Sequence, residues 1–404
     1  MRASPSVRGL ALVLALLCAG AVAWGEAVDT NPMNHDPQVQ AAFTSFHNLD
    51  FADAVARFER FHEEHPRNPQ ATAYLLNAVV FQELYRLDLL DTTLYANDGF
   101  LSGKHATPEN PAVHARVVAL TDEVVREANW RLSQNPEDVN ALFARGWARS
   151  LECTYVSMVE RGFRAGFRLA SKANNDETRV LQIDPDYGDA KLIVGVYQYV
   201  VGALPWPFKL FIGFAGITGS KSKGIELLRD AGEHGVIVGT EARTVMSLFL
   251  RREGKYKQAI EIVHGLETEY PRNFLFCLEE ANLRKDDGEG MAAVEAYRKV
   301  IAEARKPGYF VLPKLELADF GLGEALRGQR HYKDAAQAYE QAAQTEDVGT
   351  ELKIRSLVAA GKCRDVADQR HRAVEDYRAA IEAGPDTSRA DTARKYLRNP
   401  YTGS

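Results

Sequence analysis

Residues that could hold a metal ion or transfer protons are scattered through this sequence. The densest group is the run His62-Glu63-Glu64-His65. A zinc-binding H-E-x-x-H helix places its histidines four residues apart so that both reach one ion, whereas these two are three apart. His35 and His47 do not lie at a metal-binding spacing from these or other histidines, and no pair of acidic residues lies within an apolar stretch. We therefore predict no catalytic site, no metal and no cofactor, and we interpret the run as a solvated helix end.

Two further patterns that could bear chemistry are incomplete. Gly219-Ser220-Lys221-Ser222 differs from a phosphate-binding loop, which needs lysine directly after glycine, between a strand and a helix. Beyond the N-terminal apolar stretch the cysteines are Cys153, Cys277 and Cys363, which are odd in number and far apart. A disulfide framework would need more cysteines in a shorter chain. We expect these three to be small buried apolar side chains.

The elements that would carry any site are helices with a recurring apolar pattern, clearest at residues 253–271. Tyr256 is followed by Ala259, Val263 and Leu266, and this spacing places them on one helical face. Pro271 then ends the helix, because proline lacks a backbone N–H and disfavours helix in the residue before it. Similar patterns recur in residues 51–66, 332–342 and 373–385. The tandem arrangement predicts repeated helical units.

Each unit also has a first helix marked by a small residue twelve positions before the key alanine. The pairs are Ala42 and Ala54, Ser247 and Ala259, Gly323 and Ala335, and Gly361 and Ala373. We interpret the alanine as the point where a neighbouring helix approaches closely. The aromatic residue found four positions later in most units would fill the gap that remains. The sequence thus predicts antiparallel helix pairs.

Over residues 35–397 this pattern resembles the tetratricopeptide-repeat (TPR) superfamily. The resemblance implies an all-α fold: an α-solenoid of tandem helix pairs that forms a right-handed superhelix. It also implies protein or peptide binding, without catalysis, in a concave groove lined by the first helices. More locally, Leu204-Pro205, Phe211-Ile212-Gly213-Phe214 and Gly224-Ile225-Glu226-Leu227-Leu228 resemble the inclusion-body-clearance family of TPR proteins.

The N-terminus has the pattern of a secretory signal peptide. Arg2 and Arg8 precede an apolar stretch at residues 10–22, and Ala21-Val22-Ala23 offers a cleavage site. The stretch is short for a bilayer span of roughly 20 residues, which favours cleavage over an uncleaved anchor. Leu17 stands before Cys18, where a lipoprotein signal needs a small residue, so no lipid anchor is expected. We predict an exported protein, periplasmic or outer-membrane-associated, in a Gram-negative-type bacterium.

The remaining chain divides by the regularity of its repeats. We expect a flexible segment at residues 24–34, TPR-like units with insertions at 35–235, and regular TPR units at 240–386. Residues 387–404 are expected to form a capping helix and tail. In the second unit we expect an unusually long first helix over residues 71–95. The net charge of −6 argues against nucleic-acid binding, which needs a basic surface.

The residues expected to bind a partner lie on first helices and face the groove. They are Phe43, Phe46, Phe143, Trp147, Val196, Tyr199, Arg251, Asn282 and Arg327. The groove would then be aromatic in its N-terminal half and charged in its C-terminal half. The alternative is that helices of the long second unit cover the aromatic residues and make them part of the core.

Two surface features stand outside the repeat pattern. Residues 203–219 are highly apolar but too short and too rich in glycine and proline to span a bilayer as one helix. Either they fold back into the superhelix, or they contact a membrane or a partner through Leu204, Trp206, Phe208, Phe211 and Phe214. Arg161, Arg164 and Arg168 form a basic stripe, which is either an acidic partner's site or a solvated face paired with local carboxylates.

From these features we predict an exported scaffold that binds a protein or peptide partner in its groove. The alternative is a lipid or small-apolar-ligand binding protein that uses residues 203–219. An enzyme has the least support, because no acid–base or nucleophile arrangement is present in the sequence.

Overall fold

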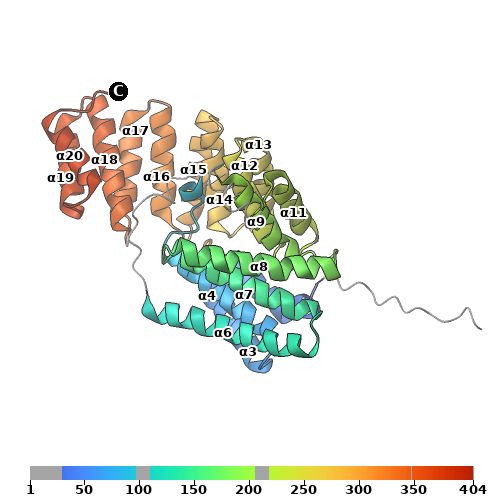
Figure 1. The fold of residues 1–404 in the computed structure, drawn as a ribbon. Coiled ribbons are helices and arrows are strands. Elements are labelled where there is room, and N and C mark those ends of the chain that lie inside the picture. The colour runs from blue at the N-terminus through green and yellow to red at the C-terminus, as the bar shows by residue number, and fades with distance from the viewer. Residues whose placement is uncertain (1–29, 97–109, 205–217, 347, 404) are drawn as a thin grey trace, which may run out of the picture.

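A computed structural model describes residues 30–96, 110–204, 218–346 and 348–403. Every regular element in these ranges is a helix (Figure 1). Among them, no helix is both long enough and apolar enough to cross a bilayer. The predicted all-α class is therefore confirmed.

The helices pack as successive antiparallel pairs, as the TPR pattern predicted. In chain order these are α2 (Pro37–His47) with α3 (Phe51–Glu64), α4 (Pro69–Arg86) with α6 (Pro111–Gln134), α7 (Val139–Met158) with α8 (Phe163–Ile183), α9 (Ala190–Ala203) with α11 (Lys221–His234), α12 (Gly239–Arg252) with α13 (Tyr256–Glu269), α14 (Phe274–Asp286) with α15 (Gly290–Ala304), α16 (Leu315–Gly328) with α17 (Tyr332–Gln344), and α18 (Thr350–Val366) with α19 (Arg370–Ala383). Each pair packs on the next, so the chain is a solenoid of TPR-type units.

Three shorter elements complete the described chain. The 3₁₀ helix η1 (Pro32–His35) precedes α2, and a second 3₁₀ helix, η2 (Thr92–Tyr95), follows α4. Helix α20 (Ser388–Arg398) packs on α18 and α19 and buries Ala390 and Ala393. In Figure 1 the pairs from α3 to α8 form the lower part of the molecule, and α12 to α20 run across its upper part.

The small residues of the first helices have the role that the sequence predicted. A Cβ atom added at Gly361 would lie 2.5 Å from the ring of Tyr377, and one at Gly323 would lie 2.6 Å from the ring of Tyr339. Real Cβ atoms do not approach so closely, so only glycine fits against each ring. Both tyrosines are fully buried. The complementary glycine and tyrosine fix how the two helices of a pair cross.

The turns inside the regular pairs share one backbone geometry. The second residue after the first helix has a positive φ, which is 69° at Gly254, 78° at Gly288, 62° at Arg330 and 57° at Asp368. The next backbone N–H then donates to a carbonyl five residues back, as from Lys255 to Leu250 at 2.8 Å. This is the Schellman arrangement that ends many helices.

The long helix expected over residues 71–95 is not formed. Helix α4 ends at Arg86, where Asp88 has a φ of 58° and the N–H of Leu89 donates to the Leu84 carbonyl at 2.8 Å. This turn redirects the chain into η2. The sequence pattern missed it because Asp88, unlike a glycine, does not signal a left-handed residue.

Candidate partner-binding surfaces

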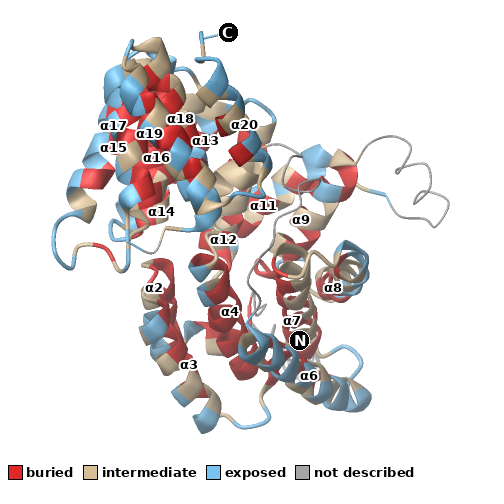
Figure 2. Ribbon diagram, turned by 90° about the vertical axis from the view of Figure 1, so that its left-hand side faces the viewer, coloured by how far each residue is buried: buried red, intermediate tan, exposed pale blue. Residues whose placement is uncertain are grey.

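The predicted aromatic contact residues of the N-terminal units are buried. The exposed fraction of Phe43 is 3%, of Phe143 0% and of Trp147 4%, and Phe46 is equally buried. Helix α4 is buried along most of its length (Figure 2). Its Tyr74 packs edge-on against Phe43 and Trp147, at ring-centroid distances of 5.7 and 6.0 Å. The second unit therefore covers these side chains, which was the alternative left open by the sequence.

Two further predicted contact residues lie at the α9–α12 boundary. Tyr199 is 2% exposed, stacks on Phe249 at 3.7 Å between ring centroids, and donates a hydrogen bond to Glu253 at 2.8 Å. Val196 is half-buried against the same cluster. Neither side chain is exposed to a partner.

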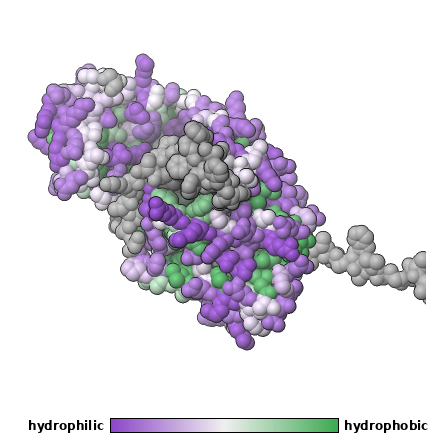
Figure 3. Space-filling view, viewed as in Figure 1, coloured by the Kyte–Doolittle hydropathy of each residue, from purple (hydrophilic) through white to green (hydrophobic). Residues whose placement is uncertain are grey.

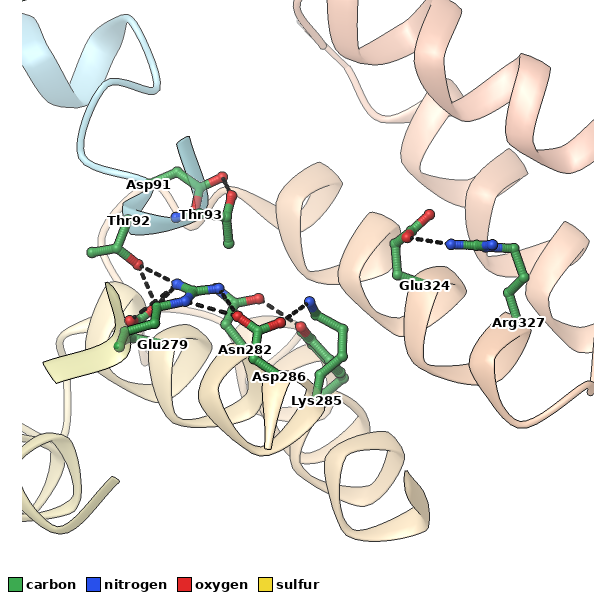
Figure 4. Close-up of polar contacts among 11 residues, drawn as sticks. Asp91, Thr92, Thr93, Glu279, Asn282, Lys285, Asp286, Glu324 and Arg327 are labelled. Carbon is green, nitrogen blue, oxygen red and sulfur yellow. Dashed lines mark hydrogen bonds and ion pairs between the residues drawn. The ribbon is translucent and has the colours of Figure 1, made fainter. Parts of the chain in front are cut away.

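Arg251 and Asn282 lie inside the molecule in a polar network (Figure 4). Arg251 donates to Asp286 at 2.8 Å and to Glu279 at 3.3 Å, and Asn282 accepts from Tyr297 at 2.5 Å. Burial opposes the charge of Arg251, but the carboxylates of Glu279 and Asp286 outweigh it and raise its pKa. This network therefore satisfies charges within the fold.

The network is closed by a segment of the N-terminal region. Thr92, at the start of η2, hydrogen-bonds to Glu279 and lies 3.2 Å from Arg251. Figure 4 shows Asp91 and Thr92 beside Glu279 and Asn282 of α14. The chain itself thus occupies the first-helix face of α12 and α14.

Direct contacts hold the first two pairs against the later ones. Asn273 donates to the carbonyl oxygen of His47 at 2.6 Å, and the ring of His47 lies 3.1 Å from Glu241. Tyr85 donates to the Leu312 carbonyl oxygen at 2.8 Å. The solenoid therefore closes on itself between helices far apart in the sequence.

Arg327 is the one predicted contact residue that is exposed, and it belongs to a basic region on α16 and α18. We call Arg327, Arg355, Lys362 and the aromatic rings beside them the C-terminal basic surface. The Arg355 guanidinium lies 4.2 Å from the Phe320 ring centroid, and the Lys362 ammonium lies 5.2 Å from that of Tyr396 and 5.4 Å from that of Tyr401. Arg355 is exposed and Lys362 is half-buried.

The charges of this surface are only partly compensated. Arg327 pairs with Glu324 at 2.8 Å, whereas Arg355 and Lys362 form no ion pair with any described residue. Burial lowers the pKa of Lys362, and the neighbouring cations, Arg327 first among them, lower it further. Burial also lowers the pKa of Arg355. A ligand carboxylate would relieve this repulsion.

The basic stripe predicted at residues 161–168 is exposed at the start of α8. Phe163 is 39% exposed and Phe167 38%. Arg164 and Arg168 are exposed and pair with no carboxylate among the described residues. Figure 3, which shows the face on which α8 lies, has hydrophobic patches among hydrophilic side chains. The expected pairing with local carboxylates is therefore not found for these two arginines.

Candidate metal ligands are already engaged by other groups. His62 lies 3.1 Å from the Thr72 hydroxyl, and His65 lies 2.9 Å from the Phe61 carbonyl oxygen. A second group, His264, Glu267 and Glu280, has ligand atoms within 4.8 Å of one another. Its carboxylates already pair with cations, Glu267 with Lys299 at 2.7 Å and Glu280 with Arg284 at 2.8 Å. These pairs would compete with a metal, so we assign no metal site there.

The remaining predictions concern the apolar insertion and the cysteines. Leu204 is the C-cap residue of α9 and is half-buried, while Trp206, Phe208, Phe211 and Phe214 lie outside the described residues. The resemblance to the inclusion-body-clearance family also stays a prediction: residues 224–228 lie in α11, but Pro205 and residues 211–214 lie outside the described residues. Cys277 and Cys363 are buried as expected, and Cys153 is half-buried. All three are free thiols.

Comparisons with known proteins give distant structural likeness only. No family model matches the chain, and no curated protein matches it. The Cut9 and Hcn1 assembly of APC/C contains a chain at 13% identity and a TM-score of 0.49, covering 92% of this chain and 57% of that one. This chain therefore spans little more than half the length of that relative.

Two other solved structures are similarly distant. PilF of Pseudomonas aeruginosa has 17% identity and a TM-score of 0.40, covering 64% of this chain and 98% of its own. Human IFIT1, solved as a dimer with PPP-AAAA, has 13% identity and a TM-score of 0.41, covering 89% of this chain and 80% of its own. Because all of these scores are low, the description as TPR-type pairs rests on the geometry of this chain.

Proposed function

We propose that this protein is a non-catalytic scaffold that binds an acidic segment of a partner protein on the C-terminal basic surface. The observation that carries the proposal is the pair of cations, Arg355 and Lys362, that lie beside aromatic rings and have no carboxylate partner among the described residues. Tandem helix pairs supply the rigid support that holds these side chains in place.

The electrostatics of the whole chain make this surface distinctive. The net charge is −6, yet Arg327, Arg355 and Lys362 gather on two neighbouring first helices. Charge-assisted hydrogen bonds to carboxylates are about twice as strong as neutral ones. Complementary charge also speeds encounter and rejects partners of the wrong sign. An acidic segment is therefore the occupant that these groups favour.

The N-terminal aromatic residues do not support the same role. Phe43, Phe143 and Trp147 are in the core, and η2 closes the network around Arg251. Partner binding through them would require the second unit or η2 to move away. Arg327 and Arg355 are exposed and Lys362 is half-buried, so a partner can reach this surface without such a rearrangement.

Short fluorescent peptides of acidic, neutral and basic composition would test the proposal by anisotropy. Acidic peptides should bind, and the charge-reversing pair Arg355→Glu and Lys362→Glu should weaken binding tenfold or more, because a hydrogen bond to a charged group is worth about 1.5–3 kcal/mol. The matched control is Arg372→Glu, at an exposed arginine of α19. Equal binding of neutral peptides, or equal weakening by the control, would refute the proposal.

Export to the periplasm or outer membrane is part of the proposal and rests on the sequence of residues 1–23. Cell fractionation followed by N-terminal sequencing would test it. Cleavage after Ala23 would leave Trp24 as the first residue of the protein in the envelope fraction. Recovery of the uncleaved chain from the cytoplasm would contradict export.

A second candidate function, peripheral membrane contact, is favoured by the first turns of α8. Phe163 and Phe167 are exposed beside Arg164 and Arg168, which suits an interface with anionic lipid. The wild-type protein should co-sediment with anionic vesicles and not with neutral ones. The double variant Phe163→Ser and Phe167→Ser should no longer co-sediment with anionic vesicles. Failure of the wild-type protein to bind anionic vesicles would remove this candidate.

A further inference from the structure

A cavity lies where the first two helix pairs meet α12, α13 and α14. Its volume is about 150 Å³. Phe46, Phe51 and Phe81 line it from the N-terminal side, and Val245, Phe276 and Leu278 line it from the other. Figure 2 shows α2 and α4 next to α12 and α14. We call this space the junction cavity, because two regions distant in the sequence form its walls.

The polar side chains around the junction cavity are mostly bonded elsewhere. Asn273 caps α14 and donates to His47, and Asn282 accepts from Tyr297. Thr244 donates to the carbonyl oxygen of Thr240 at 2.8 Å. These bonds leave aromatic and aliphatic atoms as the main inner surface. Water, which needs two to four polar partners, is poorly accommodated in such a space.

The charged groups at the wall exclude one class of ligand. Asp91 and Glu241 both line the cavity, and the Oε2 atom of Glu241 is buried without a hydrogen-bond partner among the described residues. An anion there would meet both of these carboxylates and that of Glu279, which also lines the cavity, at short range. A cation would lose its hydration against apolar walls. An uncharged molecule meets neither cost.

We propose that the junction cavity binds one uncharged apolar molecule about the size of a single aromatic ring. A dry apolar cavity of about 150 Å³ in another protein holds benzene, so the size is adequate for a ring of that kind. The ring would contact Phe46 and Phe81 on one side and Phe276 on the other. Because both regions contribute, an occupied cavity favours the closed arrangement of the solenoid.

Thermal unfolding with toluene, benzyl alcohol, naphthalene and benzoate tests this inference. Toluene and benzyl alcohol should raise the melting temperature in a saturable way, with a matching heat of binding. Benzoate should leave it unchanged, because of Asp91 and Glu241. Absence of any saturable effect of toluene, or an equal effect of benzoate, would overturn the proposal.

Variants that change the cavity size add a second readout. Leu278→Ala enlarges the junction cavity and should admit naphthalene, which the wild-type protein rejects. Val245→Phe fills the space and should abolish toluene binding, and if it fails to fold, Leu275→Phe serves the same purpose. The matched control is Leu326→Ala, because Leu326 is 3% exposed against 2% for Leu278 but lies outside the cavity. Naphthalene binding to this control, or unchanged toluene binding to a folded filled variant, would contradict the assignment.

These outcomes are separate from those of the peptide experiment. The C-terminal basic surface lies on α16 and α18, neither of which lines the junction cavity. The pair Arg355→Glu and Lys362→Glu should therefore leave toluene binding as in the wild-type protein. Loss of toluene binding in that pair would count against a site at the junction.

Discussion

The third helix pair and the last two pairs solve the same packing problem with different chemistry. Tyr339 and Tyr377 stand four residues after the key alanine and pack against glycine of the first helix. In the third pair Glu177 stands four residues after Ala173 and packs against Gly146, where an added Cβ would overlap the carboxyl group. The two helices of the third pair thus approach each other closely although a glutamate replaces the tyrosine.

The difference changes the electrostatics of the core. Glu177 is fully buried, and neither of its carboxyl oxygens has a hydrogen-bond partner among the described residues. Its neighbour Asp176 takes the available cations, pairing with Arg145 at 2.6 Å and with Arg149. Burial, with a smaller effect from Asp176, raises the pKa of Glu177 well above its usual value. The carboxyl group therefore keeps its proton to a higher pH than an exposed glutamate does.

The largest expected effect comes from closing the gap beside a tyrosine. Gly361→Ala places a methyl group against the ring of Tyr377, and such overpacking should cost about 1–3 kcal/mol of unfolding free energy. Denaturant unfolding of the variant measures the loss. The matched control is Gly265→Ala in α13, where nothing lies within 4 Å of an added Cβ. That control should gain about 0.5–1 kcal/mol, because alanine favours helix over glycine. Equal changes in both variants would refute the packing argument.

A smaller, pH-dependent effect should distinguish the buried carboxyl groups of the two regions. Because the pKa of Glu177 is raised, the folded state binds a proton that the unfolded state releases above a pH of about 4.5, and stability falls as pH rises further. Glu177→Gln removes this loss, so its stability relative to wild type should increase with pH, by up to about 1.4 kcal/mol per pH unit.

Glu324 of α16 provides the opposite response. Burial opposes its ionisation, but hydrogen bonds from Tyr339 and Arg327 outweigh this and hold its pKa below the usual value. Its contribution is therefore present above the unfolded-state pKa and is lost as pH falls through the folded-state pKa. Glu324→Gln should be less stable than wild type at neutral pH, with a smaller difference in acid. Chemical denaturation of both variants at several pH values measures the two slopes, and slopes of the same sign would show that the regions do not differ.

The smallest effect concerns the turns within the regular pairs. Asp368 has the left-handed φ that Gly254 has at the equivalent turn. Asp368→Gly should gain up to about 1 kcal/mol, because the left-handed conformation costs a side chain roughly 1–2 kcal/mol and glycine's flexibility in the unfolded state offsets part of the gain. Gly254→Ala should lose a similar amount. Melting temperatures would report both changes, and a loss in the first variant would show that the Asp368 side chain stabilises its turn.

The sequence alone determined the helix pairs and their local complementarity. Ala335, Gly323 and Tyr339 lie within one unit, so spacing in the chain indicates that they meet. The same holds for the turn at Gly254, where glycine itself signals the conformation. The same spacing recurs in several units, and this recurrence shows that the pattern is not a chance match.

Only the tertiary structure decided which of these residues a partner could reach. Tyr74 covers Phe43 and Trp147, and Thr92 closes the network around Arg251, through contacts between units that no repeat pattern specifies. The tertiary structure likewise decided that no described carboxylate pairs with Arg355 or Lys362, because the packing of distant segments sets which acidic side chains lie near a cation. In a solenoid that closes on itself, the packing of distant units decides which residues are buried and which are exposed. The spacing of residues within one unit does not predict that packing.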